Sequence, residues 1–155
     1  MIGVIADTHD NMDAIQSAVQ VFNENNVELV LHAGDYVSPF TAKPFKQLNG
    51  SMRGVFGNND GDPVTLKKYY QGIAEIEPGW IKINFKGKNI YLTHRPLPDI
   101  PSDSHLYIYG HTHQIIKKEG QRIILNPGEC SGWLTNKKTI GLVDLEKMET
   151  GIIEI

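Results

Sequence analysis

Side chains that bind metal ions recur in short motifs along this chain of 155 residues. The sequence contains six histidines and a single cysteine, so nitrogen and oxygen donors would have to form any metal site. Imidazole suits zinc, iron, cobalt, nickel and copper, whereas carboxylate and amide oxygens suit manganese and magnesium. The mixture indicates a borderline divalent ion of the first transition row. The motifs are Asp7-Thr8-His9, Gly34-Asp35, Gly57-Asn58-Asn59-Asp60, His94 and Gly110-His111-Thr112-His113.

The number of donors is as informative as their type. Each motif by itself also occurs in ordinary turns, so the weight lies in the combination. Seven donors are too many for one tetrahedral ion, but they suffice for two four-coordinate ions if one carboxylate bridges them. Two ions about 3.5–4 Å apart can clamp a phosphate and activate water for in-line displacement. The candidate metal ligands are Asp7, His9, Asp35, Asn58, His94, His111 and His113.

Short apolar runs precede these motifs and predict the strands that position them. We expect strands at residues 2–6, 29–31, 51–56, 89–93 and 106–109, and a motif follows each of them. In α/β sheets, ligands bind outside the carboxyl ends of the strands. If the five strands run in the same direction, they deliver all the donors to one rim. Gly34, Gly57 and Gly110 would let the backbone turn sharply beside the donors.

The remaining pattern predicts an α/β first half and a β-rich second half. Asn11 can cap a helix whose apolar face runs from Ala14 to Phe22, and Ser38-Pro39 can start a second helix that ends near Leu48. Further strands are expected at residues 81–85, 114–118, 122–125, 139–143 and 152–155. This order predicts two sheets packed face to face with helices outside. Because no linker or repeat interrupts the chain, we expect a single domain over residues 1–155.

Composition excludes several classes of protein. The net charge of −3 and the lack of a Lys/Arg block argue against binding of duplex nucleic acid. No apolar run approaches the ~20 residues that span a bilayer, and the start of the chain lacks a basic leader region, which argues against membrane insertion and export. The lone Cys130 cannot form an internal disulfide. These features favour a cytoplasmic protein.

In this order, the motifs resemble the signature of the calcineurin-like metallophosphoesterase superfamily, and the small size and Gly57-Asn58-Asn59-Asp60 are similar to its YfcE-like phosphodiesterase branch. The resemblance covers essentially the whole chain. It implies a four-layer α/β/β/α sandwich of two mixed sheets that holds two divalent ions, with Mn²⁺ favoured and Ni²⁺, Fe²⁺, Co²⁺ or Zn²⁺ as alternatives. One ion would be held by Asp7, His9, Asp35 and His113, and the other by Asp35 as the bridge with Asn58, His94 and His111.

The activity that the resemblance implies is hydrolysis of a small-molecule phosphodiester, with a metal-activated hydroxide attacking phosphorus. The alternatives are a phosphomonoesterase, a cyclic-nucleotide phosphodiesterase, a nuclease, and a non-catalytic interaction scaffold, which would be expected to have lost ligands. Related proteins often self-associate, which suggests a homodimer. The predicted catalytic residues are Asp35, Asn58 and His9, and the predicted substrate contacts are Asn59, Arg95 and Tyr36.

The sequence departs from the superfamily pattern at two positions. Asn59 stands where a His is usual, and an amide cannot act as a general acid at neutral pH. This departure favours diesters with good leaving groups, or leaves protonation to metal-bound water. Arg95 stands where Gly is common, and it could donate two hydrogen bonds to a phosphate or remain a solvated surface residue. Prolines disfavour a helix in the loop that follows it.

The other polar and aromatic residues that could do chemistry have structural interpretations. A buried structural role is the default for His32, and a surface role for His105. Cys130 lacks a basic neighbour in sequence and is interpreted as an inert buried thiol. Trp80 and Trp133 are interpreted as packing residues, with a subunit contact as an alternative for Trp133.

Overall fold

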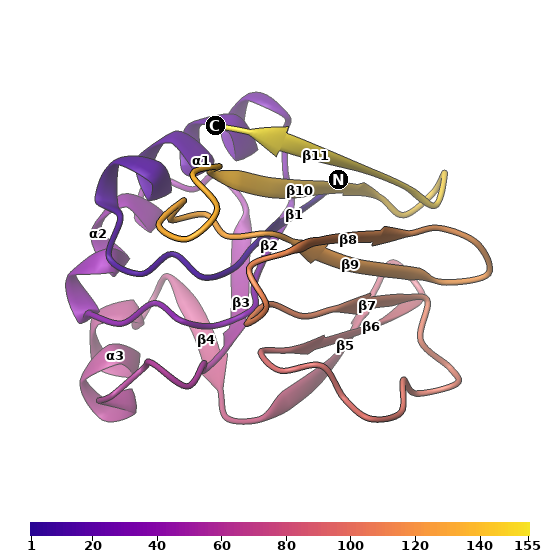
Figure 1. The fold of residues 1–155 in the computed structure, drawn as a ribbon, viewed down its shortest axis with the longest axis horizontal. Coiled ribbons are helices and arrows are strands. Elements are labelled where there is room, and N and C mark those ends of the chain that lie inside the picture. Colours follow the sequence, from indigo (N-terminus) through magenta and orange to yellow (C-terminus); the bar gives the residue numbers. More distant parts are fainter.

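The computed structural model describes residues 1–155 as two mixed sheets with helices against one of them (Figure 1). The first sheet has six strands in the order β11-β10-β1-β2-β3-β4. Strands β1 to β4 are parallel to one another, and β10 pairs antiparallel with β1. The strands are β1 (Ile2–Ile5), β2 (Leu29–His32), β3 (Ser51–Val55), β4 (Ala74–Glu77), β10 (Thr139–Asp144) and β11 (Glu149–Glu154).

The second sheet has five strands in the order β5-β6-β7-β9-β8. Its central strands β6, β7 and β9 run parallel, whereas β5 and β8 are antiparallel edge strands. Both sheets therefore contain a parallel group whose carboxyl ends can meet at one edge. The strands are β5 (Trp80–Phe85), β6 (Lys88–Thr93), β7 (Leu106–Ile108), β8 (Ile115–Lys118) and β9 (Ile123–Pro127).

The helices pack on the outer face of the first sheet. They are α1 (Met12–Glu24), the 3-10 turn η1 (Pro39–Thr41), α2 (Ala42–Phe45) and α3 (Pro63–Tyr70). The Asn11 side chain caps α1 by accepting a hydrogen bond from Ala14 N, as its position predicts. A side chain at Gly3 of β1 would collide with the Phe22 ring, so this glycine permits the close approach of α1 to the sheet.

Apolar residues from both sheets form the core that holds them face to face. Val4 and Leu31 of the first sheet and Leu92, Ile108 and Leu125 of the second are all fully buried in one cluster. Burying such side chains is the main favourable contribution to folding. The two parallel groups are therefore held at a fixed distance from each other, which fixes the loops at their ends.

The structure confirms the two mixed sheets, and several of its elements differ from those that the sequence predicts. Helix α3 was not predicted, although Asp62 caps it and Pro63 occupies its first position. Strands β10 and β11 return to the first sheet instead of extending the second. The second predicted helix is reduced to η1 and the single turn of α2.

The fourth layer of the expected sandwich is a loop and not a helix. No helix occurs after Tyr70, and the proline-rich segment 95–104 contacts the outer face of the second sheet instead. Tyr91 donates its hydroxyl proton to Asp103 Oδ1 (2.8 Å), and Leu97 N donates to the Tyr107 hydroxyl (2.7 Å). The prolines account for this, because each removes a backbone donor that a helix needs.

None of the helices has both the length and the apolar character needed to cross a bilayer.

Candidate metal centre

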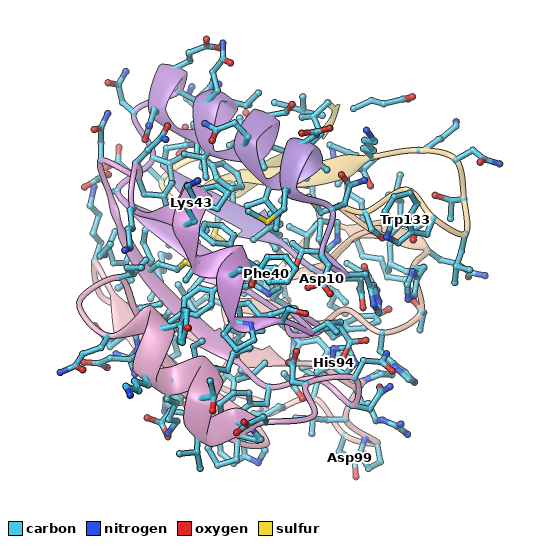
Figure 2. All side chains as sticks on the ribbon, turned by 90° about the vertical axis from the view of Figure 1, so that its left-hand side faces the viewer. Asp10, Phe40, Lys43, His94, Asp99 and Trp133 are labelled. Atoms are coloured by element: carbon cyan, nitrogen blue, oxygen red, sulfur yellow. The ribbon has the colours of Figure 1, made fainter.

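The loops that carry the predicted ligands meet at one edge of the sandwich. Asp7 N donates to Gly34 O (3.0 Å), which joins the loops after β1 and β2. Two hydrogen bonds then cross between the sheets: His111 N donates to Asp7 Oδ2 (3.0 Å), and His94 Nδ1 bonds Ala33 O (2.8 Å). The ends of β1, β2, β6 and β7 are thus tied together directly. Figure 2 labels His94 and Asp10 on the side of the molecule that faces the viewer there.

Two groups of donors form within this edge. The ligand atoms of Asp7, His9 and His113 all lie within 4.8 Å of one another, and so do those of Asp7, Asp35 and His94. Asp35 Oδ2 lies 3.5 Å from both His9 Nε2 and His94 Nε2. Asp35 therefore stands between the two groups, where a bridging ligand belongs. Asp7 is the residue that belongs to both groups, which the sequence did not indicate.

His94 and Asn58 present two lone pairs to one point. A carbonyl oxygen can only accept, so the contact with Ala33 O puts the His94 proton on Nδ1. Burial lowers the pKa of His94, which favours the neutral ring with a bare Nε2. This Nε2 lies 2.9 Å from Asn58 Oδ1. A divalent ion at about 2.1 Å from each of these two acceptors would satisfy both, and that geometry fits their spacing.

His113 is oriented by Glu129, a residue that follows β9. Glu129 Oε2 lies 2.8 Å from His113 Nδ1, which leaves Nε2 free on the side of Asp7, 3.7 Å from its Oδ1. Burial opposes the charge on Glu129, but hydrogen bonds from His113, Thr135 and Leu134 lower its pKa to about 2. A carboxylate behind a ligating histidine fixes its tautomer and raises its basicity.

His9 and Asp7 are poorly satisfied in the absence of an ion. His9 Nε2 is buried without a hydrogen-bond partner. Burial and, to a smaller extent, the nearby carboxylate of Asp35 together raise the pKa of Asp7 to about 8. A divalent cation would pair with the lone nitrogen and offset the repulsion between the two carboxylates. The residues present therefore fit a divalent metal centre.

His111 lies at the rim of this centre. Its backbone N–H holds Asp7, while its ring packs edge-on against His94 with centroids 5.0 Å apart. Burial lowers the pKa of His111, and the positive charge of Arg95 lowers it further. Arg95 is exposed and forms no ion pair, so its guanidinium is available at the mouth of the site.

The other two predicted substrate contacts have different surroundings. Asn59 is exposed and donates to Asp35 from both its backbone N (2.9 Å) and its Nδ2 (2.8 Å), so it orients the Asp35 carboxylate. The structure corrects the prediction for Tyr36: its side chain is 0% exposed and stacks on the His32 ring with centroids 3.7 Å apart. An aromatic ring in that position packs behind the site and does not face the cleft.

Two acidic residues support the site but were not predicted from the sequence as site residues. Asp60 belongs to the Gly57-Asn58-Asn59-Asp60 motif, and its carboxylate accepts hydrogen bonds from Gly57 N (2.7 Å) and Val37 N (2.7 Å). It therefore clamps the loop after β3 to the loop after β2. Glu129 could have been found by the strand-end rule, because β9 is parallel to β7 and ends beside the same edge.

Most of the residues for which the sequence predicts a structural role have surroundings that agree with that role. His32 is fully buried, and its Nδ1 accepts a hydrogen bond from Gly34 N (3.1 Å). His105 Nδ1 accepts from Asn89 N (3.0 Å). Cys130 is buried, and burial raises the pKa of its thiol far above the ordinary value. Trp133 is exposed, and its Nε1 donates to His9 O (3.0 Å) on the loop after β1.

Most of the candidate ligand residues adopt a backbone conformation that side chains disfavour. Their φ angles are 51° at Asp7, 37° at His9, 61° at Asp35, 64° at His111 and 58° at His113. Such left-handed residues cost roughly 1–3 kcal/mol each when the surroundings impose them. Their clustering at one edge is typical of a functional site.

A two-sheet sandwich with His, Asp and Asn donors at the ends of its parallel strands defines a class of metal-dependent phosphoesterases. The family model described as the calcineurin-like phosphoesterase superfamily domain matches residues 1–148. The chain belongs to this superfamily.

Individual relatives agree with this assignment. A phosphodiesterase from Methanocaldococcus jannaschii is 40% identical, over 96% of this chain and 95% of the relative. The solved structure of an archaeal phosphodiesterase superposes with a TM-score of 0.92 at 36% identity, covering 99% of both chains. The YfcE phosphoesterase from E. coli has a TM-score of 0.68 at 19% identity, covering 99% of this chain and 98% of that one, and so shares the fold.

Proposed function

We propose that this protein is a phosphodiesterase that uses two divalent metal ions. The observation that supports it most directly is the position of Asp35, whose Oδ2 is equidistant, at 3.5 Å, from His9 on one side and His94 on the other. The name of the M. jannaschii relative supports the reaction class. Asp7, His9, Asp35 and His113 would hold one ion, and Asp35, Asn58, His94 and His111 the other.

The bound ions would supply charge neutralisation for the phosphate oxygens and the hydroxide that attacks phosphorus. The protein's own residues prepare the site for them. Glu129 keeps the proton of His113 on Nδ1, and Ala33 O does the same for His94. Asn59 holds the Asp35 carboxylate with two hydrogen bonds. The left-handed loops fix these groups before any substrate arrives, which reduces the cost of reorganisation.

The proposed substrate is a small phosphodiester with a good leaving group. Asn59 cannot donate a proton to the departing oxygen, and its amide is already engaged with Asp35. A leaving group that is stable as an anion needs no general acid. Mn²⁺ is the proposed metal because the donor set mixes carboxylate and amide oxygens with imidazole, and Ni²⁺, Fe²⁺, Co²⁺ and Zn²⁺ are the alternatives.

The test is hydrolysis of bis(p-nitrophenyl) phosphate by the purified protein with added Mn²⁺ or Ni²⁺, compared with Asp35→Asn. We expect clear activity that depends on the ion and is lost in the variant. Asp13→Asn, on the exposed face of α1, is the matched control. Equal activity in Asp35→Asn, or a protein that binds no divalent ion, would contradict the proposal.

The alternatives are separated by substrate and by ligand content. Phosphomonoesters and cyclic nucleotides compared with diesters under the same conditions distinguish the related activities, and single-stranded nucleic acid in Mn²⁺ tests a nuclease. A non-catalytic scaffold is less well supported, because all seven predicted ligand positions carry residues able to bind metal.

Three further expectations stay predictions. A cytoplasmic location is supported by the lone, buried Cys130, which forms no disulfide. A homodimer is supported only by the resemblance to self-associating relatives. The single-domain organisation of residues 1–155 is supported by the apolar cluster that both sheets share.

A further inference from the structure

A cleft of about 320 Å³ opens directly beside the metal centre. Two of its lining residues, Asn58 and His94, are ligands of the proposed second ion, so the cleft continues from the position of the phosphate. Its other walls come from the end of β3, the turn before β5 and the start of the proline-rich loop. The remaining lining residues are Phe56, Gly57, Gly79, Trp80, Thr93, Arg95, Pro96 and Leu97.

The register of β5 and β6 places Trp80 at this cleft. Trp80 pairs with Thr93, the residue immediately before His94. The indole leans on Tyr91 with ring centroids 5.7 Å apart, and the residue remains 52% exposed. An exposed tryptophan fixed on a strand offers a large, rigid apolar surface at little entropic cost. The interpretation of Trp80 as a packing residue therefore describes only part of its surroundings.

Residues 93–97, which also line the cleft, are held in place by hydrogen bonds. Thr93 Oγ1 donates to Arg95 O (2.9 Å), and Leu97 N donates to the Tyr107 hydroxyl (2.7 Å). Arg95 forms no ion pair, and no Asp or Glu lines the cleft. The cleft thus combines apolar walls with one unpaired cation, which suits a flat organic group attached to an anion.

Building on the proposed function, we infer that this cleft binds an aromatic ester group of the phosphodiester, with Trp80 against its ring and Arg95 toward its phosphate. A single phosphate at the metals would leave the cleft empty. An aryl or nucleobase-bearing ester would fill it. Stacking of a ring on a protein aromatic side chain is worth ~1–3 kcal/mol, so it can decide which diesters are bound.

Equilibrium binding of two phosphonates tests this inference without turnover. Phenylphosphonate and methylphosphonate carry the same charged group and differ in the ring. We expect the Mn²⁺-loaded protein to bind phenylphosphonate more tightly in isothermal titration calorimetry. Trp80→Ala should weaken phenylphosphonate about tenfold, equivalent to ~1.4 kcal/mol, and leave methylphosphonate unchanged. Trp80→Phe, which keeps a ring, should retain most of the preference.

Tyr69→Ala is the matched control, because Tyr69 is also an exposed aromatic residue (54%) but does not line the cleft. Fluorescence gives a second readout. The chain has two tryptophans, so Trp133→Phe leaves Trp80 as the only one, and its emission should respond to phenylphosphonate and not to methylphosphonate.

The outcomes separate this inference from the proposed function. Equal affinity for both phosphonates, or an equal loss of both in Trp80→Ala, would overturn the aromatic cleft while leaving the metal-dependent hydrolysis intact. If the protein prefers the ring through Trp80 but hydrolyses no diester, the aromatic cleft is supported and the proposed reaction is contradicted. Failure of both phosphonates to bind would also overturn the aromatic cleft, while the hydrolysis assay with Asp35→Asn decides the proposed function separately.

Discussion

Two fully buried carboxylates in this site have opposite properties. Asp7, in the candidate metal centre, accepts hydrogen bonds from one donor only, the backbone N–H of His111. Glu129, in the wall behind His113, accepts from His113, Ser131, Leu134 and Thr135. Burial with a neighbouring carboxylate raises the pKa of Asp7 to about 8, whereas the donors around Glu129 lower its pKa to about 2.

The difference separates a ligand from its support. Both side chains are 0% exposed, so burial alone does not distinguish them. Glu129 is already satisfied by the protein and serves to hold a histidine. Asp7 lacks positive partners, and a cation is what would satisfy it. The number of donors around a buried acid therefore indicates which acid is available to an ion.

The largest effect is expected from Asp7→Asn. This substitution removes a ligand shared by both donor groups, and the ions' contribution of several kcal/mol should be lost with it. We expect diesterase activity to fall by about 10³-fold or more, at ~1.4 kcal/mol for each factor of ten. Kinetics with bis(p-nitrophenyl) phosphate and elemental analysis provide the measurement. Normal metal content in this variant would mean that Asp7 is not a metal ligand.

Glu129→Gln should act through His113 and have a smaller effect. The amide cannot hold His113 as strongly, so we expect metal affinity to fall by about 10–100-fold, with occupancy near His94 less affected. Competition with a chelator measures the affinity. Glu149→Gln, an exposed acid on β11, is the control. If both variants bind metal like the wild type, Glu129 does not tune the site.

The stability of the metal-free protein should depend on pH in the way that the raised pKa of Asp7 predicts. In the unfolded chain Asp7 ionises near its ordinary pKa of 3.8, whereas in the folded protein it keeps its proton up to about pH 8. Between these values the unfolded state binds fewer protons, so the free energy of unfolding falls as pH rises. Glu129, with a pKa of about 2, loses its stabilising contribution only as pH falls below 4.5.

The measurement is thermal unfolding in chelator from about pH 6.5 to about pH 8, with wild type and Asp7→Asn compared because both contain the same histidines, which titrate near the lower end of this range. The melting temperature of the wild type should fall relative to that of Asp7→Asn across this range. Added Mn²⁺ should reverse the trend, because the ion favours the ionised carboxylate. Parallel curves for the two metal-free proteins would refute the assigned shift.

The smallest effect is expected from Ser131→Ala. This change removes one of the donors to Glu129 and leaves the others, so we expect a loss of about 1 kcal/mol in the free energy of unfolding. Metal affinity should stay within about threefold of the wild type. Urea denaturation and the same chelator competition check this. A loss as large as that of Glu129→Gln would mean that the donors around Glu129 do not act independently.

Sequence patterns were sufficient to predict the elements and the rim on which the donors meet. Apolar runs ending in polar motifs identify β1, β2, β3, β6 and β7, and the strand-end rule brings their donors to one place. The pattern could not assign β10 and β11 to a sheet, because an amphipathic strand does not specify which partner it pairs with. It also could not show that Asp7 is shared between the groups, which depends on the separation of the two sheets.

Residues that act through others were harder to find. Asp60 lies within a motif and Glu129 follows a parallel strand, but the sequence does not show that these acids accept hydrogen bonds from neighbouring loops. Tyr36 was placed in the pocket because it follows Asp35, but Val37 and Asp35 both have positive φ angles, and the chain there directs the Tyr36 ring toward His32 and Tyr70. Backbone turns of this kind cannot be predicted from neighbouring positions alone.

The left-handed conformation of Asp7, His9, Asp35, His111 and His113 sets stability against activity in this protein. Glycine at any of these positions would relieve backbone strain while deleting a side chain that the proposed metal centre uses. Selection for catalysis must therefore keep residues that the fold alone would discard. In a lineage that no longer needed the reaction, these positions would be expected to drift first, and the descendants would melt at higher temperatures than the enzyme from which they came.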